Sequence, residues 1–244
     1  MSDTVQQLCF EGQNHLLATD YLAAEEVLVR AEGTALAEKD WDSLSRLYMP
    51  LQEVRRQRRQ RCGEGTIKLD LVAHTAADVI DAEAIAKQYT HGQILVAGFG
   101  TLEPAMKLRE IAHREKRYLD VLLGASYWVG GTVVVAIVPT DRVALPEDGE
   151  YSIDELTRRL PPHSVIIPLA ELPSGERMGN TETFAQTMSL WERLHLPYLS
   201  LADATTDPAA RIEAYRQTIK VDYACELAHQ KLSDTARSIL RTKQ

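Results

Sequence analysis

The stretch Ile94-Leu95-Val96-Ala97-Gly98-Phe99-Gly100-Thr101 joins four consecutive apolar residues to two glycines, and a helical pattern follows it over residues 102–113. A second apolar run, Val133-Val134-Val135-Ala136-Ile137-Val138, lies further along the chain. Continuous apolar runs of this length are typical of strands buried on both faces of a largely parallel sheet. The two runs therefore predict the centre of an α/β sheet.

The surrounding sequence alternates strand and helix patterns. Short strands are predicted at 67–71, 165–167 and 198–201, and helices at 76–90 and 184–194; residues 152–155 open a further short helix. Tyr127-Trp128-Val129-Gly130-Gly131 is open to two interpretations, an exposed aromatic loop or a core plug beside a glycine turn. We expect an α/β core over residues 66–206, with a mainly parallel sheet of about five strands and helices on both faces.

The first 62 residues are predicted to form a helical arm of about three helices. Asp20 and Asp40 are expected to cap the second and third, because an aspartate side chain accepts hydrogen bonds from unpaired first-turn amides. Gly63 and Gly65 then mark a boundary before the core. The third helix carries the clearest apolar stripe: Trp41, Leu44, Leu47, Tyr48, Leu51 and Val54.

Asp207-Pro208 predicts the start of a C-terminal helix over residues 207–244. An approximate helical stripe follows almost to the end of the chain, from Ile212 to Leu240. Such a stripe is too apolar for a solvated tail, so we expect this helix to pack on the N-terminal arm and form a helical layer with it.

The openings Asp20-Tyr21 and Asp40-Trp41, with Ala24-Glu25 after the first, resemble those of tetratricopeptide-type helical hairpins. The openings are 20 residues apart, whereas that repeat is about 34 residues long. The resemblance covers only residues 1–62. It implies a surface that holds another protein, and no chemistry.

Composition narrows the classes of function. The 244 residues carry a formal charge of −8, which opposes general attraction to nucleic acid or to anionic membranes. No apolar run approaches the length needed to span a bilayer, so we expect a cytoplasmic protein. Cys9, Cys62 and Cys225 are odd in number and far apart, which argues against disulfides and a cysteine metal site. Histidine spacing predicts no metal either.

Residues 55–61 hold five arginines in seven positions. One interpretation is that positive charge offsets the negative end of the third helix. The other is that Arg55, Arg58 and Arg59 bind an acidic protein partner or another copy of the chain.

Candidate ligand residues come from the predicted ends of strands. Gly98, Gly100 and Thr101 lie between a buried strand and a helix, where bare amides favour an anion. Ligands of open parallel sheets bind outside the carboxyl ends of the strands. Those ends also carry His74, Asp141, Ser174 and Asp203. A phosphate-containing small ligand would suit such a Rossmann-like crevice, although a tight turn and ordinary helix caps also explain these residues.

Two functions remain open. The first is a non-catalytic interaction or scaffold protein that binds a protein partner or forms a homo-oligomer, supported by the helical arm and by the lack of a recognisable catalytic motif. The alternative is an enzyme or sensor that binds a small anionic ligand at the strand ends. No cofactor is predicted.

Overall fold

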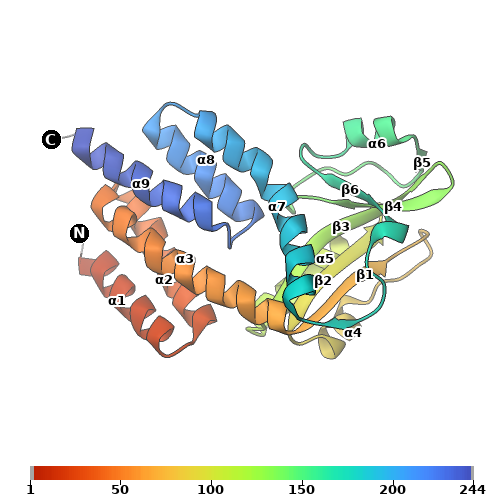
Figure 1. Cartoon of the computed structure of the whole chain (residues 1–244), viewed down its shortest axis with the longest axis horizontal. Coiled ribbons are helices and arrows are strands. Elements are labelled where there is room, and N and C mark those ends of the chain that lie inside the picture. The colour runs from red at the N-terminus through yellow and green to blue at the C-terminus, as the bar shows by residue number, and fades with distance from the viewer. Residues whose placement is uncertain (1–2, 243–244) are drawn as a thin grey trace. The chain divides into compact units, whose positions relative to one another are not determined.

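The computed structural model describes residues 3–242 and divides the chain into two compact units (Figure 1). The helical unit consists of Met1–Arg59 and His195–Gln244, and the α/β unit consists of Gln60–Leu194. Both boundaries fall inside long helices, α3 (Trp41–Glu64) and α7 (Thr181–Ala204). The second boundary, between Leu194 and His195, lies before residue 207, at which the sequence predicts the start of the C-terminal helix.

The helical unit contains parts of α3 and α7 and four further helices: α1 (Asp3–Leu17), α2 (Tyr21–Ala37), α8 (Pro208–Val221) and α9 (Glu226–Thr242). The three expected caps form as side-chain chemistry dictates, and Asp40 accepts from the backbone N–H of Ser43. Asp20 accepts from the backbone N–H of Ala23, and Asp207 accepts from that of Ala210. These helix starts therefore follow from the sequence, whereas the single C-terminal helix predicted over residues 207–244 is divided into α8 and α9 by a turn at residues 222–225.

Helices α3 and α9 lie together inside the helical unit. The α3 stripe, including Leu44, Leu47 and Leu51, is buried, and so are Leu232 and Ala236 of α9. Packing is close enough for the Ser233 hydroxyl to donate to the Ser45 carbonyl at 2.6 Å. The apolar stripes of residues from both ends of the chain thus share one core.

The residues predicted as a strand at 198–201 belong to α7, which continues through Pro197 to Ala204. Leu199 and Ala202 are buried and lie three positions apart, as one face of a helix requires. The short stretch Tyr198-Leu199-Ser200-Leu201 does not distinguish a strand from a buried helix segment, which explains the error.

One seven-stranded sheet forms the α/β unit, in the order β6-β4-β3-β2-β1-β7, with β5 beside β3. Its strands are β1 (Thr66–Val72), β2 (Gly92–Phe99), β3 (Leu119–Val129), β4 (Thr132–Ile137), β5 (Glu150–Tyr151), β6 (Val165–Pro168) and β7 (Arg177–Met178). The helical segments are α4 (Ala82–Gln88), α5 (Glu103–Arg114), α6 (Ile153–Arg159) and a 3₁₀ turn (Leu169–Glu171).

The sheet is mixed, which corrects the expectation of a mainly parallel sheet of about five strands. Strand β2 pairs in parallel with β1 and β3, and β5 is parallel to β3. The β3–β4, β4–β6 and β1–β7 pairs are antiparallel. The parallel part is therefore confined to the middle of the sheet and the short β5.

The β3–β4 turn gives the physical reason for the change of direction. Val129 pairs with Thr132, so the turn contains only Gly130 and Gly131, with φ angles of 54° and 77°. Two positive φ angles are typical of a type I′ hairpin turn, and a two-residue connection can join only antiparallel strands. Tyr127, before this turn, is fully buried, as the core-plug interpretation requires.

Helices α4 and α5 cover one face of the sheet. Ile94, Val96 and Val121 from the strands share an apolar cluster with Leu108 and Ile111 of α5. The cluster anchors α5 directly after β2, which places the loop between them at the carboxyl end of the parallel strands. Over residues 3–242, no helix is both long and apolar enough to cross a membrane.

Candidate functional site

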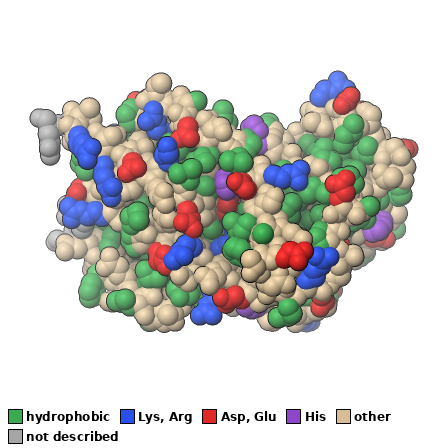
Figure 2. Space-filling model, in the orientation of Figure 1, with side chains coloured by type: hydrophobic (Ala, Val, Ile, Leu, Met, Phe, Trp, Pro, Cys, Tyr) green, Lys and Arg blue, Asp and Glu red, His purple; other side chains and the backbone are tan. Residues whose placement is uncertain are grey.

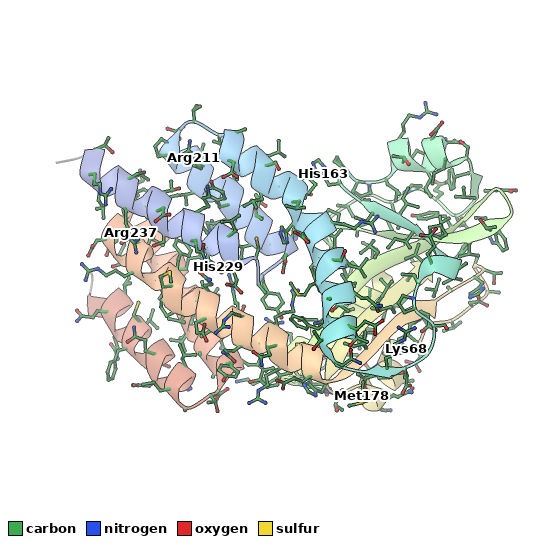
Figure 3. All side chains as sticks on the ribbon, viewed as in Figure 1. Lys68, His163, Met178, Arg211, His229 and Arg237 are labelled. Atoms are coloured by element: carbon green, nitrogen blue, oxygen red, sulfur yellow. The ribbon has the colours of Figure 1, made fainter. Side chains whose placement is uncertain are left out.

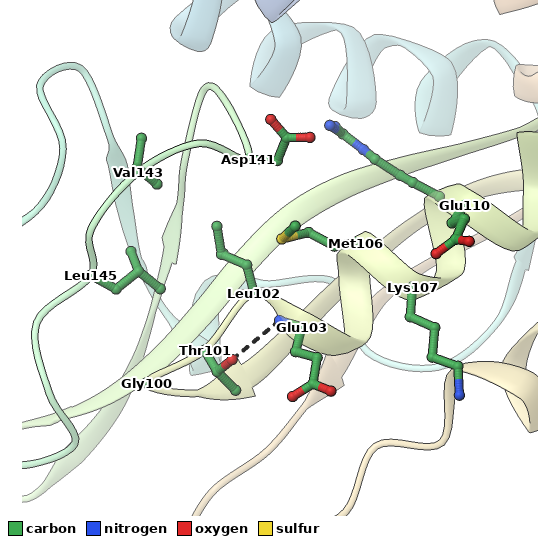
Figure 4. A pocket seen from close by; sticks show the side chains of 11 residues that line it. Gly100, Thr101, Leu102, Glu103, Met106, Lys107, Glu110, Asp141, Val143 and Leu145 are labelled. Carbon is green, nitrogen blue, oxygen red and sulfur yellow. Dashed lines mark hydrogen bonds between the residues drawn. The ribbon is translucent and has the colours of Figure 1, made fainter.

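An open groove of about 850 Å³ lies at the carboxyl end of β2 (Figure 4). The β2–α5 loop, the outer face of α5 and the loop after β4 form its walls. Its lining consists of Gly100, Thr101, Leu102, Glu103, Met106, Lys107, Arg109, Glu110, Asp141, Val143 and Leu145. This volume is within the range of about 300–1,000 Å³ that ligand pockets occupy.

The groove combines an apolar lining with carboxylates. Leu102 and Met106 from the α5 side face Val143 and Leu145 across the groove (Figure 4). Glu103, Glu110 and Asp141 are exposed, and among the described residues none of the three has an ion-pair partner. Their negative charge is therefore available to a ligand.

The two basic side chains of the groove are already engaged. Arg109 donates from Nε to the Val121 carbonyl at 2.8 Å, which ties the guanidinium to the edge of the sheet. Lys107 Nζ lies 3.8 Å from Glu83 Oε1 in an exposed ion pair. Three acids against two bases leave the lining with a formal charge of −1. The groove favours a cationic group more than an anion.

Hydrogen-bonding groups of the Gly98–Thr101 loop are already paired within the protein. The Gly100 N–H donates to the Ser126 carbonyl at 3.0 Å, and the Glu103 N–H donates to Thr101 Oγ1 at 3.2 Å. Gly100 has a φ of 63°, and a Cβ at Gly98 would lie 2.7 Å from Thr101 Cγ2. The tight turn itself therefore explains both glycines. Two backbone N–H groups that could have bound an anion, those of Gly100 and Glu103, are already paired within the protein.

The predicted ligand residues only partly converge. Gly100, Thr101 and Asp141 line the groove, whereas Gly98 is buried behind it. His74 and Ser174 are exposed and lie outside its lining.

Asp203 had been placed at a strand end, but it lies on α7 in the helical unit, where its Oδ1 accepts from the Tyr215 hydroxyl at 2.6 Å. The false strand at 198–201 caused this error. Asp203 is therefore withdrawn from the ligand set.

Arg55 and Arg59 are interior residues of the helical unit, which corrects the interpretation of the arginine run as a docking surface. Their exposed fractions are 7% and 2%. Arg55 Nε donates to Glu25 Oε1 at 2.9 Å, and Arg58 Nη1 donates to Glu25 Oε2 at 2.7 Å. Burial opposes the charge on Glu25, but the charges and hydrogen bonds of Arg58 and Arg55 lower its pKa to about 2.

Arg59 belongs to a second buried network in the same unit. Its Nη2 lies 2.9 Å from Asp222 Oδ1, and His195 Nδ1 lies 2.8 Å from Asp222 Oδ2. Asp222 is fully buried; burial raises its pKa, but Arg59 and His195 outweigh that effect, so the pKa is lowered. For His195 burial favours the neutral ring, yet the hydrogen bonds with Asp222 and Cys225 raise its pKa to about 10.

His229 of α9 has the opposite protonation state. Figure 3 labels it on the side of α9 that faces α3. Its Nδ1 lies 2.8 Å from the Cys225 carbonyl, so Nδ1 is the protonated donor and Nε2 accepts from Arg55 Nη1 at 3.1 Å. Burial, followed by the Arg55 charge, lowers the pKa of His229 to about 3.

Several groove residues were missed by sequence reasoning. Glu103, Met106 and Glu110 occupy positions i, i+3 and i+7 of α5, a spacing that places them on one helix face and could have found them. Val143 and Leu145 lie in a loop without periodicity, so no local signal points to them. No group of three or more potential metal-ligating side chains occurs within residues 3–242.

Comparison of the chain with models of protein families, with curated proteins and with solved structures returned no significant match.

Proposed function

We propose that this chain is a binding protein whose α/β unit holds a basic, partly apolar segment of a protein partner in the groove beside α5. Three carboxylates without an ion-pair partner among the described residues, set around the apolar side chains of an 850 Å³ groove, carry the proposal. Lysine or arginine side chains would pair with Glu103, Glu110 and Asp141, while aliphatic side chains would contact Met106 and Leu145.

The face of the molecule in Figure 2 fits a local contact better than a broad electrostatic one. Figure 2 shows acidic and basic side chains interspersed on the visible face. Strong discrimination between partners would then come from the groove, where loops on a rigid sheet present the contact residues.

The test is fluorescence anisotropy with labelled peptides of defined composition. A peptide of alternating lysine and leucine should bind the full-length chain, more weakly as salt is raised, because screening weakens exposed charge pairs. Its glutamate–leucine counterpart should not bind. The double variant Asp141→Asn with Glu110→Gln should lose about tenfold or more in affinity, in line with two weakened charge contacts.

Glu192→Gln is the matched control, since Glu192 is an exposed acid of the same unit outside the groove. It should bind the lysine–leucine peptide as the wild type does. Equal loss in the control and in the double variant would mean that net charge, not the groove, attracts the peptide.

The alternative of a small anionic ligand is tested in parallel with inorganic phosphate and ATP. If either raises the melting temperature of the wild type and Gly100→Asp abolishes that shift, the groove is an anion site and the peptide proposal is wrong.

A second candidate function concerns the helical unit, which the tetratricopeptide resemblance links to protein binding. Phe10 and Leu17 on α1 are 66% and 82% exposed and lie two turns apart on one helix face. Replacing both with serine should weaken any self-association seen by sedimentation. Unchanged sedimentation of a wild type that does self-associate would remove this face from consideration.

A further inference from the structure

Two carboxylates of the groove are held at a fixed interval on one helix. Glu103 and Glu110 are seven residues apart on α5, and both are exposed. A rise of about 1.5 Å per residue separates their backbone positions by about 10 Å, and about 3.6 residues per turn places both on one face. Leu108 and Ile111 anchor α5 in the buried apolar cluster. The interval therefore adjusts to a ligand only through the torsions of the two glutamate side chains.

Met106 separates the two carboxylates with an apolar surface. It follows Glu103 by three positions and precedes Glu110 by four, which places it on the same helix face. Its side chain is 41% exposed, and a flexible thioether adapts to apolar partners of different shape. Leu145 lies across the groove (Figure 4). The groove thus offers negative charge at two points with an apolar contact between them.

Lys107 lies in the same interval but is directed elsewhere. Its Nζ lies 3.8 Å from Glu83 Oε1 of α4. In Figure 4 the side chain points away from Asp141 on the opposite wall. The lysine charge is therefore drawn toward α4, whereas Glu103 and Glu110 have no ion-pair partner among residues 3–242.

A polyproline II segment matches the interval between the two glutamates. Its rise of about 3.1 Å and its three residues per turn bring side chains three positions apart onto one side, about 9 Å from each other. In an extended strand, side chains two positions apart share a face but are only about 7 Å apart, and those three positions apart point to opposite faces. A helix presents the interval only across about two turns, and an isolated helix that short is marginal in water. Polyproline II needs no internal hydrogen bonds, so a segment of a few residues is enough.

We propose, on the basis of the function proposed above, that the partner segment carries two basic residues three positions apart in a polyproline II stretch. One cation pairs with Glu103 and the other with Glu110, while their aliphatic stems cover Met106. The apolar residue between them faces Leu145. Glu103 and Glu110 determine specificity, because their interval on α5 selects the interval of the cations. Asp141 adds charge from the other wall.

The experiment compares three peptides of identical composition by fluorescence anisotropy with the full-length chain. Gly-Lys-Pro-Leu-Lys-Pro-Pro-Gly places its lysines three positions apart, Gly-Pro-Lys-Leu-Lys-Pro-Pro-Gly two apart, and Gly-Lys-Pro-Leu-Pro-Lys-Pro-Gly four apart. The first should bind about threefold to fivefold more tightly than the others, which is the effect of one exposed ion pair.

The outcomes separate this inference from the function on which it rests. Equal affinities for the three peptides would overturn the lysine interval and leave the groove a binding site for basic segments. If none of the three binds, and the lysine–leucine peptide does not bind either, the function proposed for the groove is wrong as well.

Substitutions on the two walls separate register from charge. Glu103→Gln and Glu110→Gln each leave one carboxylate on α5, so the preference for lysines three positions apart should disappear. Asp141→Asn is the matched comparison, which should weaken all three peptides alike and keep the preference. Glu192→Gln, at an exposed acid outside the groove, should change neither. A preference that survives Glu110→Gln, or that Asp141→Asn abolishes, would overturn the inference.

A helical peptide tests the competing conformation. An alanine-rich peptide of about 20 residues with two lysines seven positions apart presents the same interval from a helix. It should bind more weakly than the peptide with lysines three positions apart, because keeping it helical costs conformational entropy that the prolines have already removed. Tighter binding of the helical peptide would show that the groove takes a helix, and the polyproline II inference would be wrong.

Discussion

The helical unit encloses charges, whereas the apolar cluster of the α/β unit is built almost wholly from aliphatic side chains. Arg55, Arg59 and Asp222 are buried in the helical unit and satisfied by one another or by histidines. The α/β cluster, to which Ile94 and Leu108 belong, contains no charged residue, although Asp120 of β3 is buried in the same unit. The free energy gained by burying apolar side chains does not depend on pH, whereas the free energy contributed by buried ionisable groups does. The two units should therefore respond differently to acid and to substitutions that remove a charge.

Asp222→Asn should have the largest effect. The substitution leaves Arg59 and the His195 imidazolium without their anion in a dry site, which should destabilise the helical unit by about 3–5 kcal/mol. Hydrogen exchange with peptide resolution measures each unit separately, and faster exchange should be confined to peptides of the helical unit.

Asp234→Asn is the control for this experiment, because Asp234 is an exposed acid of α9 paired only at the surface with Arg237. Its effect should be within about 0.5 kcal/mol. Equal destabilisation of the α/β unit by Asp222→Asn would show that the contrast between the units does not exist.

The sequence predicted the positions of the main elements better than the direction of the strands. The apolar runs at 94–97 and 133–138 lie in β2 and β4, and Ser152 caps α6 as its spacing to Glu155 indicated. An apolar run reports burial but not the direction of its neighbour. That information was in Gly130-Gly131, which is interpreted above only as part of an aromatic loop or as a glycine turn beside a core plug, and not as a hairpin signal.

The candidate site was predictable only where local pattern and topology coincide. Gly100 and Thr101 were found because a buried strand delivers them to a helix start, as the structure shows. The pairing of Arg59 with Asp222 was not found, since these residues are 163 positions apart and only the tertiary fold brings them together. A dense arginine run looks the same in sequence whether it faces solvent or buried acids.

The stability of the helical unit should depend on pH, with an effect smaller than that of Asp222→Asn. The folded-state pKa of His229, about 3, lies below its ordinary value of 6.5, so the stability it contributes is present above pH 6.5 and lost as pH falls. The loss should approach about 1.4 kcal/mol per pH unit. Glu25, with a pKa near 2, adds a further loss only below its ordinary value of 4.5.

Thermal melts between pH 6.5 and 4.5 therefore isolate His229. His229→Gln should flatten this slope, whereas His113→Gln, an exposed histidine of α5, should leave it unchanged. His195 has the reverse sign, because its raised pKa gives stability present below pH 6.5 and lost as pH rises through about 10. A helical unit equally stable at pH 6.5 and 4.5 would contradict the buried, neutral state of His229.

The smallest expected effects come from two glycines that test backbone conformation without touching a charge. Gly33 lies inside α2 with no atom within 4 Å of an added Cβ, so Gly33→Ala should stabilise the helical unit by about 0.5–1 kcal/mol. Gly131, in the β3–β4 turn, also has space for a Cβ, but its φ of 77° is one that alanine adopts only with strain. Gly131→Ala should therefore destabilise the α/β unit by about 1 kcal/mol. Chemical denaturation of both variants at one pH measures the two shifts. Shifts of the same sign would mean that the turn does not require positive φ at this position, so that its description as a type I′ turn would be wrong.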